Sequence, residues 1–535
     1  MEATYILPSV RMPIDRPASA VLQAAAGRMR SMGIGGILTY RVYRRSVDAR
    51  KRDAIDFVYS VAVRGDFSVK EEERLVRAGL ILLRAEEPEV HPGHESMGGR
   101  PIVVGSGPAG MFCALLLAES GYRPLLLERG GDITERKAAV ARFRADGLLD
   151  TDSNIQFGAG GAGTFSDGKL VTRVNDGMTG YVLRRFVEFG APEEITFLSK
   201  PHIGTDRLCT VVEGVLARLI ACGGEVRYHA HVTDIVPDGD GIAGVLLRDG
   251  TAIACGPLVL ATGHSARDTY SMLMKRGVHL EPKAFSVGLR AEHLQEDIDR
   301  ALYGRYAGHP ALGHAEYALS DRSDARGVYT FCMCPGGEVV AAASESGGVV
   351  VNGMSRYARD GRNANAAVAV SVLCEDYGNR PERAIAFQRE IERVAYQAAG
   401  SDYRAPACLL GDFLEGRCVR EPKRIEPSYR DGNVCLCLPD DYLPPFVCRA
   451  LRQSLPGFGR RIEGYDAWDA VLTGPETRTS APVRIVRGEA RTAPGFSNLY
   501  PCGEGAGYAG GITSAALDGL RTAMAVIGRY RAPAD

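Results

Sequence analysis

The first 95 residues alternate between strand-like and helix-like patterns of apolar positions. Val10, Met12 and Ile14 are apolar at every second position, as in a half-buried strand. The elements that the pattern predicts after them are a helix at 18–32, strands at 37–45 and 55–63, a helix at 69–79 and a strand at 80–83. The order β-α-β-β-α-β predicts a small α+β domain of ferredoxin-like type at residues 1–95.

The chain changes character at a polar, glycine-containing segment, His91 to Arg100, which is typical of a linker. Residues 100–270 then alternate short apolar runs with helical patterns, as α/β domains do. Residues 275–470 combine strand-like and helical patterns without a regular alternation. Their predicted elements are strands at 284–292, 328–333 and 339–344 and a helix at 381–399. The last 65 residues return to short strands, a glycine-rich loop and a final helix.

A dinucleotide-binding pattern stands at the start of the α/β region. The apolar run Pro101–Val104 leads directly into the string GSGPAG at 105–110, and a helical pattern follows it. Gly105 allows a tight turn, Gly107 lets the backbone approach a pyrophosphate, and Gly110 lets the helix pack closely on the strand. The N-terminus of that helix presents free N–H groups to phosphate oxygens.

The second apolar strand, Pro124–Leu127, ends in Glu128, eighteen residues after Gly110. A carboxylate at this place accepts hydrogen bonds from ribose hydroxyls and favours an adenosine ribose without a 2′-phosphate. The pattern therefore indicates FAD or NAD rather than NADP, and it does not choose between the first two.

A second glycine-rich cluster, NIQFGAGGAGTFSDGKL at 154–170, favours FAD. Four glycines lie within ten residues, so the segment is a poor helix and a poor strand. Such a loop suits backbone that lies against a flat ligand or a phosphate. A flexible linker is the alternative, but Phe157, Phe165 and Leu170 give the segment apolar anchors that linkers seldom carry.

A third cluster, NLYPCGEGAGYAGGITSAALDG at 498–519, lies near the C-terminus. A short strand at 499–502 enters the pair Gly503-Glu504, and Gly510-Gly511 opens a final helix. In large FAD-dependent oxidoreductases a Gly-acid pair at this point binds a ribityl hydroxyl, and the next helix directs its N-terminus to the flavin. There the helix dipole would favour the negative charge of reduced flavin. Glutamate stands here in place of the commoner aspartate.

The segment LVLATGHSARD at 258–268 contains a further strand, Leu258–Leu260, followed by Ala261-Thr262-Gly263. It resembles the Ala-Thr-Gly (ATG) segment that closes the FAD domain in large FAD-dependent oxidoreductases. The FAD domain would then be discontinuous, with an insertion between two outer parts. Together the four segments predict the cofactor-binding residues Gly105, Gly107, Pro108, Ala109, Gly110, Glu128, Arg129, Gly160, Gly161, Ala162, Gly163, Thr164, Thr262, Gly263, Gly503, Glu504, Gly510, Gly511 and Ile512.

Several strings together resemble the bacterial FAD-dependent dehydrogenases of the uncharacterised NAD(P)/FAD-dependent oxidoreductase family. The resemblance covers nearly the whole chain and implies FAD binding, an inserted substrate domain and a reductase or dehydrogenase role. The strings are SVDARK at 46–51, GSGPAG at 105–110, NIQFGAGGAGTFSDGKL at 154–170, ATGHSARDT at 261–269, KAFSVGLRAEH at 283–293, FCMCPGG at 331–337, NGMS at 352–355, GPETRTSAPVRI at 474–485 and YPCGEGAGYAGGI at 500–512.

Two residues are candidates for catalysis. His264 follows the ATG segment at a cofactor edge, and histidine titrates near neutral pH, which suits proton delivery. A hydrogen-bonded structural histidine is the alternative. Arg478 lies in a segment, 476–484, that resembles one lining the flavin face, where a guanidinium could hold an anionic substrate or offset charge on reduced flavin. A local ion pair is the alternative for Arg478.

Two Cys-x-Cys pairs, Cys332/Cys334 and Cys435/Cys437, place thiols two residues apart. In an extended strand such residues share a face, so each pair could bind a metal or relay electrons. Zinc needs four ligands, and neither pair has two further ligands at the usual spacing. The chain also contains no Cys-x-x-Cys. We therefore expect buried reduced thiols and no metal.

Composition narrows the class of protein. The 535 residues are 45% hydrophobic and 24% charged, with a net charge of -1, which argues against disorder and against a bulk attraction to nucleic acid. No apolar run reaches the roughly 20 residues that a membrane-spanning helix needs. The 13 scattered cysteines are typical of a reduced, cytoplasmic protein.

We therefore predict the α/β fold class, with a Rossmann-like FAD-binding domain of glutathione-reductase type at 100–270 and 471–535. An inserted α+β substrate domain occupies 275–470. The leading hypothesis is an FAD-dependent oxidoreductase that passes a hydride between flavin and a small organic substrate. Because no second dinucleotide fingerprint is present, NAD(P)H would visit transiently or another donor would reduce the flavin.

Two further hypotheses stay open. A basic cluster at Arg44, Arg45, Arg50, Lys51 and Arg52 could hold RNA for an RNA-modifying flavoprotein. Interleaved aspartates favour a solvated face instead, so nucleic-acid binding is the weaker expectation. The other hypothesis is a non-catalytic flavin redox sensor.

Overall fold

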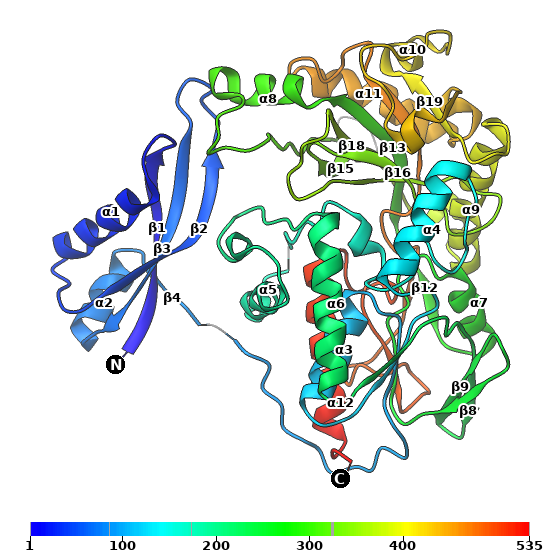
Figure 1. Cartoon of the computed structure of the whole chain (residues 1–535), viewed down its shortest axis with the longest axis horizontal. Coiled ribbons are helices and arrows are strands. Elements are labelled where there is room, and N and C mark those ends of the chain that lie inside the picture. Colours follow the sequence, from blue (N-terminus) through cyan, green and yellow to red (C-terminus); the bar gives the residue numbers. More distant parts are fainter. Residues whose placement is uncertain (1, 85, 173, 323–325, 534–535) are drawn as a thin grey trace.

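The computed structural model describes residues 2–84, 86–172, 174–322 and 326–533. Three units follow one another in space (Figure 1). A small N-terminal unit stands at one side, a parallel-sheet unit lies at the base near the C-terminus, and a unit built on a large, mostly antiparallel sheet lies above it. An extended segment joins the first unit to the second.

The N-terminal unit has the ferredoxin-like arrangement. Its antiparallel sheet has the order β2-β3-β1-β4, with two helices in the order β-α-β-β-α-β. The elements are β1 (Glu2–Pro13), α1 (Ala18–Ser31), β2 (Thr39–Asp48), β3 (Asp56–Asp66), α2 (Val69–Arg77) and β4 (Ile81–Leu82). Val21, Ala25 and Met29 are spaced by four residues and fully buried, so α1 covers the sheet with one apolar face.

Strand β1 is longer than the alternation at Val10–Ile14 predicts. Its pairing with β3 slips between Leu7 and Val10, and Ser9 has a positive φ of 57°. This bulge inserts an extra residue and shifts the apolar phase, so a strict period of two covers only the second half of the strand.

The second unit is built on a five-stranded parallel sheet of order β23-β11-β5-β6-β7. Its strands are β5 (Ile102–Val104), β6 (Leu125–Leu127), β7 (Glu225–Arg227), β11 (Leu258–Leu260) and β23 (Leu499–Pro501). Strand β11 pairs with β5 on one side and with β23 on the other. The four separated strands predicted for a dinucleotide-binding domain therefore lie in one sheet, and this prediction is confirmed.

Helix α3 (Pro108–Glu119) is buried on nearly every side because it lies between the sheet and two further helices. These helices are α6 (Thr205–Ala221) and α12 (Ile512–Arg529), and the three lie side by side in Figure 1. A small antiparallel sheet and three further helices complete the unit. They are β8 (Val232–Asp238), β9 (Gly241–Leu247), β10 (Ala252–Ala254), α4 (Ile133–Asp146), α5 (Thr179–Glu188) and α7 (Arg267–Lys275).

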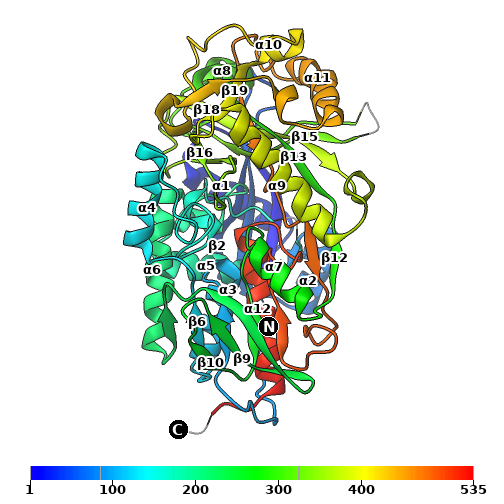
Figure 2. The same cartoon turned by 90° about the vertical axis from the view of Figure 1, so that its right-hand side faces the viewer.

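The third unit contains a seven-stranded sheet of order β14-β15-β18-β13-β21-β19-β20. The strands are β13 (Phe285–Leu294), β14 (Ser320–Asp321), β15 (Val328–Cys334), β18 (Asn363–Val372), β19 (Ala405–Leu409), β20 (Val434–Leu436) and β21 (Val471–Glu476). A hairpin, β16 (Glu338–Ala341) and β17 (Val351–Met354), lies beside it. The helices are α8 (Gln295–Tyr303), α9 (Pro381–Ala398), α10 (Leu410–Glu415) and α11 (Pro445–Gly459). Helix α9 packs against β19 and β21, and α11 packs against β14, β15 and β18 (Figure 2).

The predicted boundary at residue 471 is wrong in one respect. Residues 471–476 form β21, which pairs with β13 and with β19 and so belongs to the inserted sheet. All six residues of β21 are buried, since the strand lies inside that sheet. The short strand β22 (Val483–Ile485) pairs with β12 (Leu280–Pro282) between the two units. Of the described strands after residue 470, β23 is the one that rejoins the parallel sheet.

The N-terminal unit is attached through the edge of its sheet. The backbone N–H of Arg45 in β2 donates to Phe197 O at 2.7 Å, and Ser199 N–H donates to Arg45 O at 2.9 Å. The Arg45 guanidinium lies over the rings of Phe57 and Phe197. In the part of the chain that the structure describes, no helix is both long and apolar enough to span a bilayer.

Candidate cofactor and active site

A cavity opens where the parallel strands β5, β6 and β11 end. It contains about 1510 Å³ of empty space, counted out to its opening, and its wall comes from all the glycine-rich segments. The predicted residues that line it are Gly105, Gly107, Pro108, Ala109, Glu128, Arg129, Gly161, Ala162, Gly163, Thr262, Gly263, His264, Arg478, Glu504, Gly510, Gly511 and Ile512. Segments some 400 residues apart in sequence therefore face one space.

The first glycine-rich turn connects β5 to α3. Gly105 has a φ of 99°, which only glycine adopts without strain, and Gly107 is the residue before the first turn of α3. A Cβ added at Gly107 would meet only Gly161 Cα, at 3.9 Å, so this glycine faces open space. Gly110 does not line the cavity: its Cα packs on the Gly105 carbonyl, which is the close helix packing expected of it.

The second glycine-rich segment crosses the first. A Cβ on Gly161 would lie 2.8 Å from Gly107 Cα, and a Cβ on Gly163 would lie 3.0 Å from Ile512 Cγ1. Gly163 therefore fills the narrow space between the first turn and the start of α12. Gly160 and Thr164 lie behind this wall, outside the cavity lining, and Gly160 N–H donates to Ser106 Oγ at 3.3 Å.

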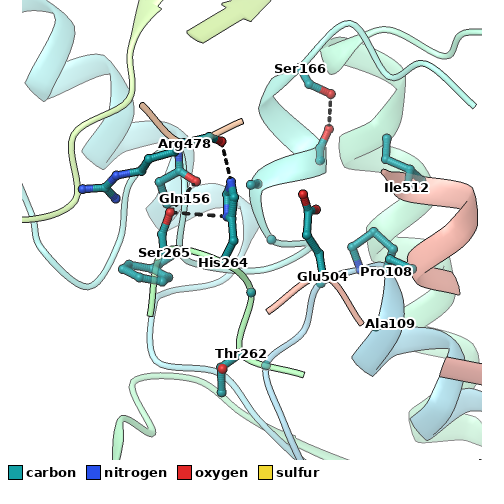
Figure 3. Close-up of a pocket in the computed structure, with 18 of the residues that line it drawn as sticks. Pro108, Ala109, Gln156, Ser166, Thr262, His264, Ser265, Arg478, Glu504 and Ile512 are labelled. Carbon is teal, nitrogen blue, oxygen red and sulfur yellow. Dashed lines mark hydrogen bonds between the residues drawn. The ribbon is translucent and has the colours of Figure 1, made fainter. Parts of the chain in front are cut away.

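The third segment brings the N-terminus of α12 to the cavity through Gly510, Gly511 and Ile512. Glu504 points into the cavity between His264 and Pro108 (Figure 3). Gly503 lies behind it, and its N–H donates to Asp518 Oδ2 at 2.7 Å.

Asp518 is the centre of an ion-pair network that the sequence did not reveal. Its carboxylate pairs with Arg487 at 2.7 Å and with Arg491 at 2.8 Å while it accepts the Gly503 N–H. Burial by itself would raise the pKa of Asp518, but the two guanidinium groups lower it to about 2. Asp518 therefore holds the loop that carries Glu504.

Glu128 lines the cavity but already accepts four hydrogen bonds. Its Oε2 accepts from Ser106 N–H at 2.9 Å and from Ser106 Oγ at 2.7 Å, and its Oε1 accepts from the N–H groups of Gly130 and Gly158, both at 3.0 Å. The carboxylate thus ties three loops together at the end of β6. Contact between the Glu128 carboxylate and a ribose hydroxyl stays a prediction. Such a contact requires that a carboxylate oxygen accept the ribose hydroxyl in addition to at least one of these four donors.

Arg129 lies beside Glu128 on the same wall. Its guanidinium carbon lies 4.2 Å from the centre of the Phe157 ring, and Nη2 pairs with Asp268 at 3.0 Å. Thr262 and Gly263 follow β11 at the same edge of the sheet and line the same cavity. The contact of the ATG segment with the cofactor stays a prediction.

His264 lies on the cavity wall with its ring fixed at one nitrogen. Nε2 lies 2.8 Å from the carbonyl oxygen of Arg478, so it must carry the proton. Nδ1 lies 3.4 Å from Ser265 Oγ, whose hydroxyl donates at 3.0 Å to Gln156 Oε1. The Nδ1 lone pair therefore remains available, and the structural and catalytic interpretations of His264 are compatible with each other.

Arg478 is not free to hold an anionic substrate. Its guanidinium is buried and pairs with the buried Glu392, with Nη2 3.0 Å from Oε2, and it also contacts Ser344 Oγ. Glu392 is shared with Arg267, whose Nη2 lies 2.7 Å from Oε1. The ion-pair alternative describes Arg478, because the carboxylates of α9 and its surroundings already neutralise the cation.

The cavity wall also contains residues to which sequence reasoning assigned no role at the site. They are Ser166, Asp167, Lys169, Phe331, Cys332, Cys334 and Asn352. Glu476 and Thr479, from the segment 476–484 that resembles one lining the flavin face, line the same cavity. Lys169 Nζ donates to Asp167 at 2.7 Å and contacts Met333 O. The position of Lys169 in the string SDGKL at 166–170, within the second glycine-rich cluster, could have indicated that this lysine lies at the site.

The expectation of buried thiols is wrong for Cys332, which is exposed and lines the cavity. Cys334 and Cys437 are buried, and Cys435 is half-buried with its sulfur 3.8 Å from that of Cys437. The described residues contain no group of three or more His, Cys, Asp or Glu side chains arranged to hold a metal ion.

Three of the five cationic side chains in the basic cluster of the N-terminal unit already have partners within the chain. Arg50 pairs with Asp48 at 2.6 Å, Arg52 lies 3.8 Å from Glu463, and Arg45 stacks between two phenylalanine rings. Partners within the chain therefore compete with any phosphate for these cations.

The parallel sheet, its first glycine-rich turn and the cavity at the strand ends define a dinucleotide-binding protein of Rossmann-like class. Residues 103–151 match the family of NAD(P)-binding Rossmann-like domains, residues 284–479 match the family "FAD-dependent protein, C-terminal domain-like", and residues 8–64 match a domain family of unknown function. A protein of Clostridium beijerinckii, named only "Uncharacterized protein", is 45% identical over 503 residues, which are 92% of this chain and 93% of that one. The chain belongs to this bacterial family of FAD-dependent proteins.

Several solved structures are similar to this chain at low sequence identity and with low TM-scores. The flavin-dependent brominase Bmp2 is 12% identical over 80% of this chain and 79% of that chain, with a TM-score of 0.38. The halogenase PltM is 12% identical over 81% and 71%, with a TM-score of 0.38. CtdE in complex with FAD is 11% identical over 80% and 84%, with a TM-score of 0.32.

FAD is the cofactor, and the cavity fits it. Two helix N-termini, those of α3 and α12, meet the same space, and the first N–H groups of each helix have no partner within their helix. Gly107 leaves the room that a pyrophosphate needs, and Glu504 offers a carboxylate to sugar-like hydroxyls. When bound, FAD supplies hydride transfer, which no protein side chain can perform.

Proposed function

We propose that the protein is an FAD-dependent oxidoreductase that passes a hydride between flavin and a small organic substrate. The observation that supports this most is the cavity itself. It continues past the glycine-rich segments of the FAD-binding unit to a second wall made by β15, β17 and β21 of the inserted unit. A protein that only stored or sensed flavin would not need a polar wall beyond the cofactor.

The wall beyond the glycine-rich segments carries groups suited to substrate chemistry. Asn352, Thr479 and Cys332 present hydrogen-bonding or proton-transfer groups, and His264 has an available Nδ1. General acid–base catalysis by such groups contributes about 10²–10⁴-fold to enzymatic rates. The inserted unit would therefore bind the substrate and the parallel-sheet unit would bind the cofactor.

NAD(P)H is the proposed electron donor, as a transient visitor. The single glycine fingerprint at 105–110 is used by FAD, so a nicotinamide would approach through the open side of the cavity. We assign no nucleic-acid function to the N-terminal unit, because Arg45, Arg50 and Arg52 have partners within the chain.

The test begins with the purified protein, which should carry FAD that is released on denaturation. Anaerobic stopped-flow mixing with NADH and with NADPH then identifies the donor from bleaching of the flavin absorbance. Reoxidation by a panel of ketones, enones, quinones and disulfides identifies the acceptor class. Turnover with any pair supports an oxidoreductase, whereas FAD that no donor and acceptor pair cycles would leave a redox sensor as the better description.

A further inference from the structure

Strand β15 contains a bulge on the cavity wall. Phe331 pairs with Ala367 of β18, and Cys334 pairs with Asn365, so Cys332 and Met333 together oppose the single residue Ala366. Cys332 has a φ of 43°, in the left-handed region that side chains rarely adopt. Bulges beside active sites turn a side chain away from its regular face. Here the bulge breaks the i, i+2 relationship that a regular strand would give Cys332 and Cys334.

The two thiols consequently have different surroundings. Cys334 is buried, and its thiol donates to the Cys332 carbonyl oxygen at 3.3 Å. Cys332 is exposed, and within the described ranges its sulfur has no hydrogen-bond partner. Protein nevertheless surrounds Cys332 closely enough for burial to raise the pKa of its thiol to about 12. Cys332 also lines the cavity, so part of its exposed surface faces that space.

Asn352 on β17 lies on the same wall with its amide orientation determined. Its Oδ1 accepts hydrogen bonds from Arg290 Nη2 at 2.9 Å and from Gly353 N–H at 2.8 Å. Two donors at one atom require that atom to be the oxygen, so the other atom is the NH₂ group. Among the described residues this NH₂ group has no acceptor, and Asn352 lines the cavity. It is therefore a free hydrogen-bond donor.

Among the described residues, each cation at this wall has a carboxylate partner. Lys169 pairs with Asp167 at 2.7 Å, and Arg290 pairs with Glu476 through two contacts of 2.5 and 3.0 Å. Arg478 pairs with Glu392, as described above. Within the part of the chain that the structure describes, a substrate carboxylate or phosphate would find no unpaired positive charge at this wall, whereas a neutral acceptor oxygen would find an amide donor.

We propose that Asn352 and Cys332 are the substrate-contacting pair for an uncharged carbonyl compound with a conjugated double bond. The Asn352 amide donates a hydrogen bond to the carbonyl oxygen, and Cys332 is the proton donor. This inference rests on the proposed function, because the hydride that reaches one carbon of the double bond comes from the reduced cofactor. The S–H bond of Cys332 breaks, its proton goes to the neighbouring carbon, and the thiolate takes a proton from water. The high pKa keeps the thiol protonated at neutral pH until the substrate carbon accepts the proton.

The first measurement is binding, with the oxidised FAD-loaded protein and 2-cyclohexen-1-one and two larger uncharged enones as probes. Flavin difference spectra report the affinity without turnover. Asn352→Leu should weaken binding about tenfold, which is the effect of one hydrogen bond. A cyclohexene carboxylate should bind more weakly than the enone. Absence of binding by every enone, or tighter binding of the carboxylate, would overturn the proposal.

The second measurement is anaerobic reoxidation of dithionite-reduced protein. Cys332→Ala should slow reoxidation by the enone about 100-fold, and Cys332→Ser should restore part of the rate, because a hydroxyl can still donate. Ferricyanide takes electrons without a carbon-bound proton, so its reaction should not change. Cys374→Ser, a half-buried cysteine outside the cavity lining, is the matched control. An unchanged enone rate in Cys332→Ala overturns the proposal, while continued flavin reduction and ferricyanide reoxidation would leave the proposed function intact.

Discussion

The Nε2 atom of His264 donates a hydrogen bond to the carbonyl oxygen of Arg478 across 2.8 Å. The two residues are 214 positions apart. His264 follows the strand β11 that closes the cofactor sheet, and Arg478 follows the inserted strand β21. One imidazole therefore ties the FAD-binding unit to the inserted unit at the rim of the cavity, while its second nitrogen remains available.

Substitution of His264 separates the structural bond from proton transfer. Glutamine places an amide N–H near the position of Nε2, so His264→Gln should keep the contact with Arg478 O and retain FAD. His264→Ala loses the bond and should lower the free energy of unfolding by about 1–2 kcal/mol. We expect turnover of His264→Gln to fall at least tenfold if Nδ1 moves a proton. Thermal melts, FAD content and turnover should be measured together, and wild-type turnover in His264→Gln would leave His264 with a structural role alone.

The Arg478–Glu392 pair gives a prediction about stability rather than affinity. Arg478→Gln leaves a buried carboxylate with fewer partners, so the protein should lose about 3 kcal/mol of stability. If Arg478 instead held an anionic substrate, the same substitution would raise KM and leave the melting temperature unchanged. Exposed Arg484, in the same segment, provides the control Arg484→Gln, which should melt as the wild type does.

Gly107 and Gly161 face each other, but their substitution should have different consequences. Gly107 has an ordinary negative φ and open space around its missing Cβ, so Gly107→Val should fold and yet fail to bind FAD. Gly161 has a φ of 64°, and its Cβ would lie 2.8 Å from Gly107 Cα, so Gly161→Ala should destabilise the fold itself. Melts of both apoproteins, with flavin absorbance after reconstitution, distinguish these outcomes. Stoichiometric FAD in Gly107→Val would show that the pyrophosphate lies elsewhere.

Glu504 points into the cavity between His264 and Pro108 (Figure 3). Glu504→Gln removes a charged acceptor, which is worth about 1.5–3 kcal/mol, so the FAD dissociation constant should rise about 10- to 100-fold. Fluorescence titration of apoprotein with FAD measures this change. Glu489→Gln, an exposed glutamate in the neighbouring segment, should bind as the wild type does. Equal affinities in both variants would contradict a contact with the cofactor.

The residues on the cofactor side of the site could be predicted from the sequence, because the glycines there stand in recognisable motifs. Gly105, Gly107 and Gly161 are needed for backbone conformation and close approach, and these requirements are local. The short apolar strands that precede them identify the parallel sheet for the same reason. The motifs alone were enough to predict that four strands, far apart in the sequence, lie in one sheet.

The substrate side could not be predicted in the same way, since its residues depend on long-range pairing. Cys332 faces the cavity only because β15 bulges against β18, and the Cys-x-Cys spacing suggested the opposite. The NH₂ group of Asn352 is free only because Arg290 and a backbone N–H use its oxygen. The partner of Arg478 lies 86 residues earlier in the chain, on α9.

The Asp518 network predicts how acid affects the site. The pKa of Asp518 is lowered from its ordinary value of 3.8 to about 2 by Arg487 and Arg491, against the opposing effect of burial. A carboxyl group whose pKa is lower in the folded state stabilises the protein above its unfolded pKa and loses this contribution as the pH falls through the folded value. The depression corresponds to about 2 kcal/mol, present in full above about pH 5 and lost progressively toward pH 2. The Glu504 loop should then loosen, because Gly503 N–H is held by the same carboxylate. Asp518→Asn should therefore melt well below the wild type at pH 7, and the gap should narrow as the pH falls from 5 to 3. A gap of constant size over this range would show that the charge of Asp518 does not stabilise the loop.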